Sequence, residues 1–350
     1  MSKQLNLGDR LVGPGRPVFV IAEAGVNHNG ELSKAFELID VAARAGADAV
    51  KFQTFIAEKT ISAHAAKAEY QKLSTGAEES QLEMVRRLEI SFDDFRKLKT
   101  HCDERGITFL STPFDFESVD FLHSLGVPAF KISSGDLTNH PLLRRVAAKG
   151  APVIVSTGMG DLAEVEEAIS VIRAEGNDQI VLLQCVTNYP ADPSDVNLRA
   201  MQTMAKTFDV PVGYSDHTLG IEVALAATAL GACVIEKHFT LDRTLPGPDH
   251  QASMEPHELE ALVVGIRKVE AALGSGLKTA AASEMGNASV ARRSLVAARD
   301  IKAGELLTLE MIDLKRPGTG LPPKMLDEVV GKTARVDLKA GTLLELEMLI

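Results

Sequence analysis

Residues 18–23 read Val-Phe-Val-Ile-Ala-Glu, a short apolar run that ends directly in a carboxylate. Further along the chain, other short apolar runs also end in residues suited to chemistry, which gives eight such ends in all. The remaining polar ends lie at 51–53, 111–112, 131–134, 156–157, 184–189, 215–217 and 236–238. A buried strand needs no charge at its end, so the succession predicts one shared surface assembled from many segments.

Segments of helical period separate these runs. Asp161 is a plausible N-cap with Glu164 at the capping-box position, and apolar residues at spacings of three and four follow as far as Gly176. The runs themselves are continuously apolar, as expected for parallel strands covered on both faces. Eight such units in about 275 residues predict an α/β protein with a (β/α)8 TIM barrel. A doubly wound open sheet is the competing fold, but it would gather its ligand groups mostly at one switch point.

The pattern also predicts how the chain divides. Residues 1–274 would form the barrel, 275–288 a linker of low hydrophobicity, and 289–350 a small second domain with short β-like pieces. Residues 56–88 are too many for an ordinary strand-to-helix connection. This segment is either an active-site lid or a surface excursion with one short helix, and both interpretations stay open.

Charge and composition narrow the possible partners. The 350 residues include 37 Lys and Arg against 48 Asp and Glu, a net charge of −11, which argues against nucleic acid or an anionic membrane as the main partner. The longest apolar stretch, 223–235, is too short to cross a bilayer, and the first residues lack the apolar core of a signal peptide. The three cysteines are widely spaced and suit a reducing compartment. We therefore expect a soluble cytoplasmic protein.

Two histidines suggest a metal site. His217 and His238 close the seventh and eighth runs, which would be neighbours in a barrel. A lone histidine is more often structural, but two at matching positions on adjacent strands favour a shared ion. Asp216 and Glu236 could orient the imidazoles or hold metal-bound water. Two imidazoles with oxygen ligands suit Mn²⁺ or Mg²⁺, and Zn²⁺ or Co²⁺ stay open.

Two lysines suggest an anion site at the same mouth. Lys51 and Lys131 lie between apolar neighbours at strand ends, where a lysine binds an anion, forms a Schiff base, or pairs with a carboxylate such as Glu23. The turns at 133–135 and 156–160 offer hydroxyls and backbone N–H groups, which together make a phosphate or carboxylate cradle. A compact dianion is the expected ligand.

Glu23 is the candidate general base or acid, because apolar surroundings raise the pKa of a carboxyl group. A salt bridge to Lys51 is the alternative for this residue. Cys185 ends the sixth run and is expected to be a small buried thiol rather than a nucleophile. The loop at 315–320, Lys-Arg-Pro-Gly-Thr-Gly, is by default a solvated surface loop.

Several motifs together resemble the bacterial sialic acid synthase family, of the N-acetylneuraminate and legionaminate synthase type. They are Ile-Ala-Glu-Ala-Gly-Val-Asn-His-Asn-Gly (21–30), Val-Lys-Phe-Gln-Thr-Phe (50–55), Ser-Thr-Pro-Phe-Asp (111–115), Lys-Ile-Ser-Ser-Gly-Asp (131–136), Tyr-Ser-Asp-His-Thr (214–218), Glu-Lys-His-Phe-Thr-Leu-Asp (236–242) and Pro-Gly-Pro-Asp-His (246–250). The tail, with 315–320 and Val-Val-Gly-Lys-Thr-Ala (329–334), resembles the C-terminal antifreeze-like (SAF, β-clip) domain of that family.

The resemblance implies a metal-dependent condensation of phosphoenolpyruvate with the open-chain aldehyde of an N-acylated amino sugar. Water would enter, the C–O bond of phosphoenolpyruvate would break, and a nonulosonic acid and phosphate would leave. N-acetylmannosamine, giving N-acetylneuraminate, is the first expected substrate. The second is 2,4-diacetamido-2,4,6-trideoxymannose, giving N,N'-diacetyllegionaminate. The metal would be Mn²⁺, with Mg²⁺ or Co²⁺ as alternatives; His217 and His238 would hold it, and it would polarise the sugar carbonyl.

The resemblance also assigns roles to residues. The catalytic set would be Glu23, Lys51, Gln53, Glu236 and Asp249. Substrate binding would fall to Thr112, Phe114, Lys131, Ser133, Ser134, Ser156, Thr187, Asn188, Tyr189 and Arg316. Family members are domain-swapped homodimers, so Arg316 in the tail would cover the barrel of a second copy.

Two other functions are weighed against this one. A Schiff-base aldolase would use Lys131 or Lys51 as nucleophile and free pyruvate as donor. A carbohydrate- or ice-binding protein would use the barrel only as a scaffold. Borohydride trapping with pyruvate would support the aldolase, and activity that survives loss of His217 and Glu23 would support the scaffold.

Overall fold

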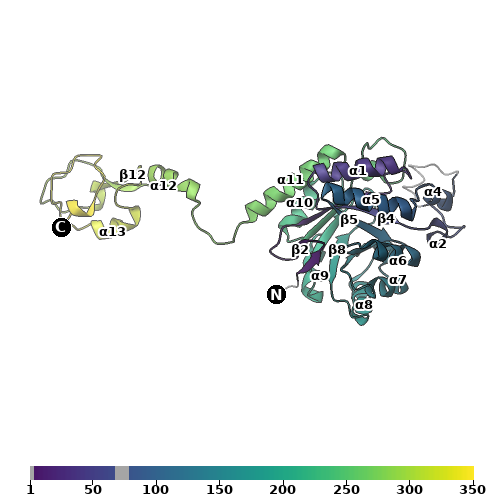
Figure 1. The fold of residues 1–350 in the computed structure, drawn as a ribbon. Coiled ribbons are helices and arrows are strands. Elements are labelled where there is room, and N and C mark those ends of the chain that lie inside the picture. The colour runs from purple at the N-terminus through teal and green to yellow at the C-terminus, as the bar shows by residue number, and fades with distance from the viewer. Residues whose placement is uncertain (1–3, 68–78) are drawn as a thin grey trace. The chain divides into compact units, whose positions relative to one another are not determined.

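The computed structural model describes residues 4–67 and 79–350 and confirms the predicted barrel (Figure 1). Eight parallel strands form one sheet in the order β5-β4-β3-β10-β9-β8-β7-β6, and the two end strands lie side by side, so the barrel is nearly closed. The strands are β3 (Phe19–Gly25), β4 (Ala49–Thr54), β5 (Thr108–Pro113), β6 (Phe130–Ile132), β7 (Val153–Ser156), β8 (Ile180–Cys185), β9 (Val212–Asp216) and β10 (Val234–His238). All eight carboxyl ends therefore surround one mouth.

Helices follow the strands and cover the outside of the barrel (Figure 1). They are α1 (Leu32–Arg44), α5 (Phe92–Arg105), α6 (Phe116–Leu125), α7 (His140–Ala147), α8 (Leu162–Ala174), α9 (Arg199–Phe208), α10 (Glu222–Ala229) and α11 (Pro256–Leu273). The predicted start of α8 is confirmed. Asp161 accepts hydrogen bonds from the N–H groups of Ala163 and Glu164, and the Glu164 carboxylate accepts one from the Asp161 N–H at 3.0 Å.

The strand register explains why the polar residues share the barrel interior. On β3, Phe19 and Ile21 belong to the apolar cluster inside the barrel, whereas Val20 and Ala22 pack toward the helices. Because side chains alternate along a strand, the next inward residue is Glu23. Each inward series thus starts apolar and turns polar at the mouth.

A short hairpin closes the opposite end of the barrel. Its strands, β1 (Leu5–Leu7) and β2 (Arg10–Val12), pair antiparallel. Leu5, Leu7 and Val12 are buried in the same cluster as the lower interior residues of the barrel. The sequence analysis assigned no structure to this segment, because two strands of three residues leave almost no periodic signal.

The chain divides into two compact units, Met1–Gly274 and Ser275–Ile350. The second unit has its own apolar core, which includes Leu295, Leu307 and Leu344, around the antiparallel pair β11 (Ser294–Ala297) and β12 (Ile312–Lys315). The predicted linker 275–288 is not plain coil. It contains η4 (Ala282–Glu284) and the first turn of α12 (Met285–Ala291). The other short helices of this unit are η5 (Leu309–Met311), η6 (Pro323–Met325), α13 (Leu326–Val329) and η7 (Leu346–Met348).

The long segment after β4 contains α2 (Ala57–Thr60) and α4 (Gln81–Arg87). A capping box between Ser80 and Glu83 begins α4. Residues 68–78 lie outside the described residues, so both interpretations of this segment, a lid and a surface excursion, stay open. In the described part, Phe55, Met84 and Leu88 form a small buried apolar cluster with Val26.

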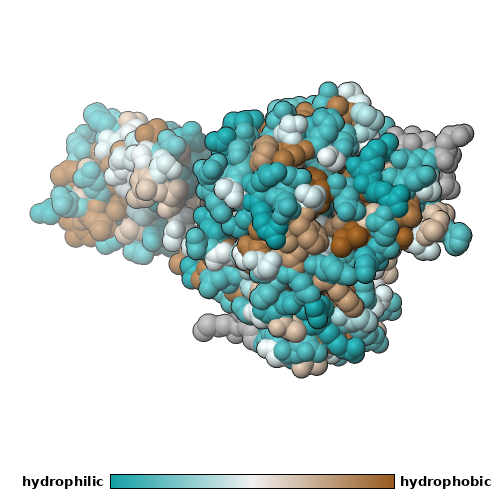
Figure 2. All heavy atoms as spheres, turned by 45° about the vertical axis from the view of Figure 1, so that its right-hand side comes forward, coloured by the Kyte–Doolittle hydropathy of each residue, from teal (hydrophilic) through white to brown (hydrophobic). Residues whose placement is uncertain are grey.

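The face of the molecule drawn in Figure 2 is mostly hydrophilic, with smaller apolar areas between. In the part of the chain that the structure describes, no helix combines the length and the apolar character that crossing a membrane requires.

Candidate active site

The mouth of the barrel holds a cavity of about 610 Å³. Most of the residues predicted for the site line it. They are Glu23, Lys51, Gln53, Thr112, Phe114, Lys131, Ser133, Ser134, Ser156, Thr187, Tyr189, His217, Glu236 and His238. Since they come from β3 to β10 and the loops that follow, the shared surface inferred from the strand ends exists.

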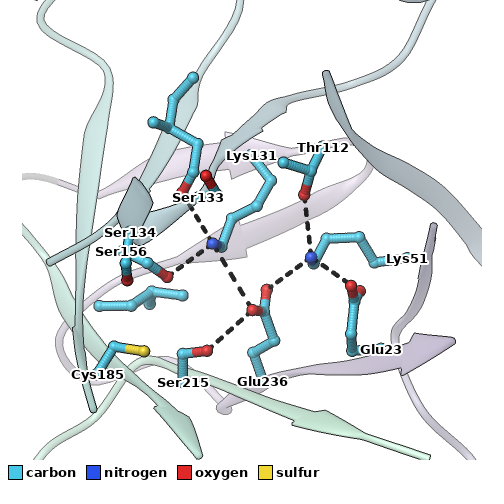
Figure 3. A network of polar contacts seen from close by, with 12 residues as sticks. Glu23, Lys51, Thr112, Lys131, Ser133, Ser134, Ser156, Cys185, Ser215 and Glu236 are labelled. Atoms are coloured by element: carbon cyan, nitrogen blue, oxygen red, sulfur yellow. Dashed lines mark hydrogen bonds and ion pairs between the residues drawn. The ribbon is translucent and has the colours of Figure 1, made fainter. Parts of the chain in front are cut away.

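Four buried charges form the floor of this cavity (Figure 3). The ammonium of Lys51 lies 2.8 Å from the Glu23 carboxylate and 3.6 Å from the Glu236 carboxylate. Lys131 lies 3.7 Å from the other oxygen of Glu236. Glu236 therefore bridges the two lysines. The predicted ion pair between Glu23 and Lys51 also forms, and it lies inside the cavity.

Hydroxyl groups complete the coordination of both lysines (Figure 3). Lys51 donates to the Thr112 hydroxyl at 3.1 Å, and Lys131 donates to the Ser156 hydroxyl at 2.6 Å. The Ser215 hydroxyl donates to Glu236 at 3.0 Å. Sequence reasoning did not select Ser215, although its place two residues before His217 on the same strand face could have indicated it.

Burial and charge set the protonation of this floor. Burial raises the pKa of Glu23 to about 7, and the charge of Lys51 only partly offsets it. Burial also lowers the pKa of Lys131. Burial would raise the pKa of Glu236, but the charges of Lys131 and Lys51 hold it below its ordinary value. Glu23 is thus the carboxyl group that can exchange a proton near neutral pH.

The two imidazoles meet above this floor. The ring centroids of His217 and His238 are 5.3 Å apart, and the Tyr189 ring packs against both, at 4.1 Å and 5.7 Å. The Nδ1 atom of His217 lies 2.6 Å from the Val186 carbonyl oxygen. If Nδ1–H donates to this carbonyl, Nε2 carries the lone pair, which is the usual arrangement of a metal-binding histidine.

The donor set fits a cation held by two imidazoles. In residues 4–67 and 79–350, no group of three or more His, Cys, Asp or Glu side chains is arranged to hold an ion. The Nδ1 atom of His238 is buried without a hydrogen bond, and burial holds the pKa of this ring well below its usual range, which keeps it neutral. Burial would lower the pKa of His217, but the Cys185 thiol and the Val186 carbonyl raise it, so a proton would compete with a cation there. Further ligands would have to be substrate or water oxygens.

The expectation that Asp216 and Glu236 orient the imidazoles was wrong, whereas a role of Glu236 in holding metal-bound water stays a prediction. Asp216 does not face the imidazoles, because its side chain lies on the opposite face of β9 and pairs with Lys237 at 2.7 Å. It also accepts from the Thr218 N–H at 2.8 Å. Glu236 contacts the lysines and Ser215 instead of orienting an imidazole.

The backbone cradle predicted at 156–160 is also largely occupied. The N–H groups of Thr157, Gly158 and Gly160 already donate to Leu183 O, Ser134 Oγ and Thr157 O. Recognition of an anion at this turn therefore falls mainly to side chains.

Three predicted residues lie elsewhere. Asn188 is exposed and does not line the cavity. Asp249 lines an adjoining pocket, where its carboxylate lies 4.0 Å from Nδ1 of His238, and burial raises its pKa to about 6. Arg316 follows β12 in the second unit and is exposed, so its relation to the cavity stays a prediction.

The mouth of this barrel combines a buried pair of lysines, a carboxyl group that can exchange a proton, and two imidazoles. This combination is suited to an enzyme. The chain matches the NeuB family over residues 38–278 and the SAF domain over residues 292–350. It therefore belongs to the NeuB family of sialic and legionaminic acid synthases, and it is a condensing enzyme of the transferase type.

Individual members of the family are similar to the chain over most of its length. The chain is 49% identical over 94% of its length to the N,N'-diacetyllegionaminic acid synthase of Campylobacter jejuni, of which it covers 99%. It is 50% identical over 93% of its length to the protein of the same name from Legionella pneumophila, of which it also covers 93%. The crystal structure of N-acetylneuraminic acid synthetase from Leptospira borgpetersenii, in complex with citrate, superposes with a TM-score of 0.74 at 39% identity, covering 82% of this chain and 95% of the other.

Proposed function

We propose that this enzyme condenses phosphoenolpyruvate with the aldehyde of an N-acylated amino sugar, releasing a nonulosonic acid and phosphate. One observation carries the proposal: a buried pair of lysines bridged by Glu236 lies in the same cavity as two converging imidazoles. An anionic donor and a polarisable carbonyl can therefore meet in one space.

The lysines and hydroxyls suit the anionic donor. Lys51 and Lys131 are nearly inaccessible to solvent, so their charges act on a ligand through a medium that screens them weakly. With Glu23 and Glu236 both ionised the floor is electrically balanced, whereas protonation of Glu23 leaves a net positive charge. The lysines and the hydroxyl groups beside them would bind the anionic groups of phosphoenolpyruvate, while ionised Glu23 remains able to accept a proton.

Glu23 would then serve as proton acceptor. C3 of phosphoenolpyruvate bonds to the aldehyde carbon, whose oxygen takes up a proton from solvent and becomes a hydroxyl group, and an electron-deficient centre is left at C2. Water adds there and gives up a proton, and Glu23, with a pKa of about 7, is placed to take it. The tetrahedral centre finally expels phosphate by breaking the C–O bond.

His217 and His238 would hold a divalent cation, with Mn²⁺ favoured over Mg²⁺ because imidazole binds Mn²⁺ better, and with Co²⁺ as an alternative. When bound, the cation supplies Lewis-acid polarisation of the sugar carbonyl. The packing of Tyr189 against both rings supports a fixed orientation for the pair.

The identity of the sugar remains between two candidates. N-acetylmannosamine was the first expectation from the sequence, and the name of the Leptospira protein supports it. The names of the two relatives at about half identity support the second candidate, 2,4-diacetamido-2,4,6-trideoxymannose. We propose the trideoxy sugar as the natural substrate on this ground.

The test measures phosphate released from phosphoenolpyruvate with each sugar, with and without chelator. Sugar-dependent release that stops on chelation and returns with Mn²⁺ is the expected result. Borohydride inactivation with free pyruvate, without phosphate release, would instead establish the Schiff-base aldolase and remove this proposal.

We further propose that Arg316 of one copy completes the cavity of a second copy in a homodimer, as the resemblance implies. Arg316 is exposed in a loop of the tail unit, so it is accessible to another chain. The test mixes Glu23→Gln and Arg316→Ala chains, each impaired alone. If the arginine acts in trans, random pairing restores one intact site per mixed dimer and about a quarter of the wild-type activity. If it acts within its own chain, nothing is restored.

Cysteine usage supports a reducing compartment for this reaction. Cys102, Cys185 and Cys233 are buried free thiols. Disulfides are rare where cellular thiols are kept reduced. The cytoplasm is therefore the compartment that we propose, and fractionation of expressing cells tests it.

A further inference from the structure

The loop after β10 carries Asp249 to the edge of the main cavity. Asp249 stands at the N-cap position of the short helix η3 (His250–Ala252), yet its side chain makes no capping hydrogen bond. Its carboxylate lies 4.0 Å from Nδ1 of His238, beyond hydrogen-bonding distance. Within the part of the chain that the structure describes, no group donates a hydrogen bond to this carboxylate. The position of the carboxylate is therefore set by the backbone that carries it.

The residue directly after Asp249 ties this loop to two other segments. His250 is fully buried. Its Nδ1 atom lies 2.6 Å from the Thr240 hydroxyl, and its Nε2 atom lies 3.2 Å from the side-chain oxygen of Asn29. An amide oxygen can only accept, so Nε2 carries the hydrogen and Nδ1 accepts from the hydroxyl. Burial lowers the pKa of His250 to about 4, so the ring is neutral at neutral pH and keeps both hydrogen bonds.

A serine hydroxyl makes a second tie to the same loop. Ser253 donates to the backbone oxygen of Asp249 at 2.7 Å and accepts from the Asn27 amide at 2.9 Å. The Asn27 amide also donates to the backbone oxygen of Phe239 at 2.8 Å. Asn27 and Asn29 both lie in the loop after β3. Two separate chains of hydrogen bonds thus join that loop to Asp249 and to its neighbour in sequence.

Close packing leaves this loop little freedom. A Cβ atom at Gly247 would lie 2.6 Å from Cδ2 of His250 and 2.8 Å from the side-chain oxygen of Asn29. Only glycine fits there without moving both partners. Asn29 itself has a φ of 53°, a left-handed conformation that asparagine adopts more readily than most residues. The backbone on both sides of the contact is therefore specialised for it.

The carboxylate held in this way faces the space proposed for the sugar. In the proposed function, on which this inference rests, the aldehyde end of the sugar lies beside His238. Asp249 and His238 line the same pocket of about 220 Å³, which adjoins the main cavity. A buried charge so close to the reacting end has to be placed accurately, because a shift of about 1 Å can cost a factor of about 10² in rate.

We infer that Asn29, Thr240 and His250 are positioning residues that hold the Asp249 carboxylate for the sugar and leave phosphoenolpyruvate binding untouched. All three lie outside the lining of the main cavity and of the adjoining pocket, so they act through Asp249 and do not contact the substrate. The anion-binding lysines stand on β4 and β6, away from these ties.

The first experiment breaks the tie through His250 at either end. Thr240→Val removes the hydroxyl and nearly keeps the shape, and Asn29→Gly removes the amide at a backbone conformation that glycine favours. Each variant should raise KM for the sugar by about tenfold, measured by phosphate release, and change KM for phosphoenolpyruvate by less than about twofold. Thr240→Ser, which restores the hydroxyl, should keep the wild-type constants.

The matched control is Thr228→Val. Thr228 is a buried threonine of α10 whose hydroxyl donates to the backbone oxygen of Ala224 in its own helix. This variant should leave both KM values unchanged. Equal rises of both KM values in Thr240→Val would show a general structural role for Thr240 and overturn the inference.

The second experiment combines Thr240→Val with Asp249→Asn. The single Asp249→Asn variant should raise KM for the sugar, and Thr240→Val should then add little, because the charge that it positions is already absent. Additive effects, or an Asp249→Asn variant with the wild-type KM for the sugar, would contradict the inference and leave the proposed function intact. If the wild-type protein releases no phosphate with any sugar, the proposed function itself fails.

Discussion

The strongest mechanistic prediction concerns the ionisation of Glu23. Burial raises its pKa from 4.5 to about 7, so the carboxyl group is mostly protonated at pH 6 and mostly ionised at pH 8. If it acts as the base, kcat/KM should rise with pH and level off above about pH 7. Glu23→Gln keeps the size of the side chain but cannot accept the proton, and should lower kcat by about 10²-fold to 10⁴-fold.

The raised pKa of Glu23 also makes the folding stability depend on pH. Between pH 4.5 and about 7 the folded protein holds the Glu23 proton while the unfolded chain releases it. Folding stability should therefore fall as pH rises through this window. The shift from 4.5 to about 7 corresponds to a loss of about 3 kcal/mol, an upper value because Lys51 shares the titration. The Glu23→Gln variant should lack this part of the pH dependence.

The assay follows initial rates of phosphate release from about pH 5.5 to about pH 9, together with urea unfolding at the two ends of the range. Glu104→Gln, which removes an exposed carboxylate on α5, is the matched control and should keep the wild-type profile. If the rise of kcat/KM near pH 7 persisted unchanged in the Glu23→Gln variant, Glu23 would not be the base.

Three further predictions test other parts of the site. Lys131→Met should raise KM for phosphoenolpyruvate by about tenfold to a hundredfold with little change in KM for the sugar, because one buried charge-assisted contact to the donor is lost. Equal changes in both constants would contradict this role. His217→Ala should weaken Mn²⁺ binding, measured by calorimetry, and wild-type turnover unaffected by a chelator would remove the metal from the proposal. Lys237→Met should destabilise the fold by about 3–5 kcal/mol, because it leaves Asp216 buried without its cation. In thermal unfolding, Lys302→Met, which breaks an exposed ion pair, should change little by comparison.

Much of the barrel could be predicted because its signal repeats along the chain. Apolar runs with polar ends fixed the strands, and a capping box such as that of Asp161 fixed the start of a helix. Glu23, Lys51 and Lys131 were selected because charges directly after buried strands are costly unless they are paired or functional. The structure places all three in one cavity.

The features of the site that were not predicted depend on contacts between residues that a single sequence does not reveal. Asp216 lies next to His217, but a strand turns neighbouring side chains to opposite faces, and the face of Asp216 is decided by Lys237 on the next strand. The small buried cluster of Val26, Phe55 and Met84 joins residues that are distant in sequence, and no spacing in the sequence pairs them. Backbone N–H groups at 156–160 looked available because two of their acceptors, Leu183 O and Ser134 Oγ, lie in other segments of the chain.

The layered interior of the barrel also separates what the enzyme needs for folding from what it needs for chemistry. On β3 the lower inward residues Phe19 and Ile21 pack in one cluster with the hairpin, and along the strands only the last one or two inward residues reach substrate space. Substitution at Glu23 or Glu236 can thus alter the reaction while the dry layers beneath stay complete. A library that varies these positions, with each buried carboxylate and its lysine changed together, would explore new donors and acceptors without leaving a buried charge unpaired.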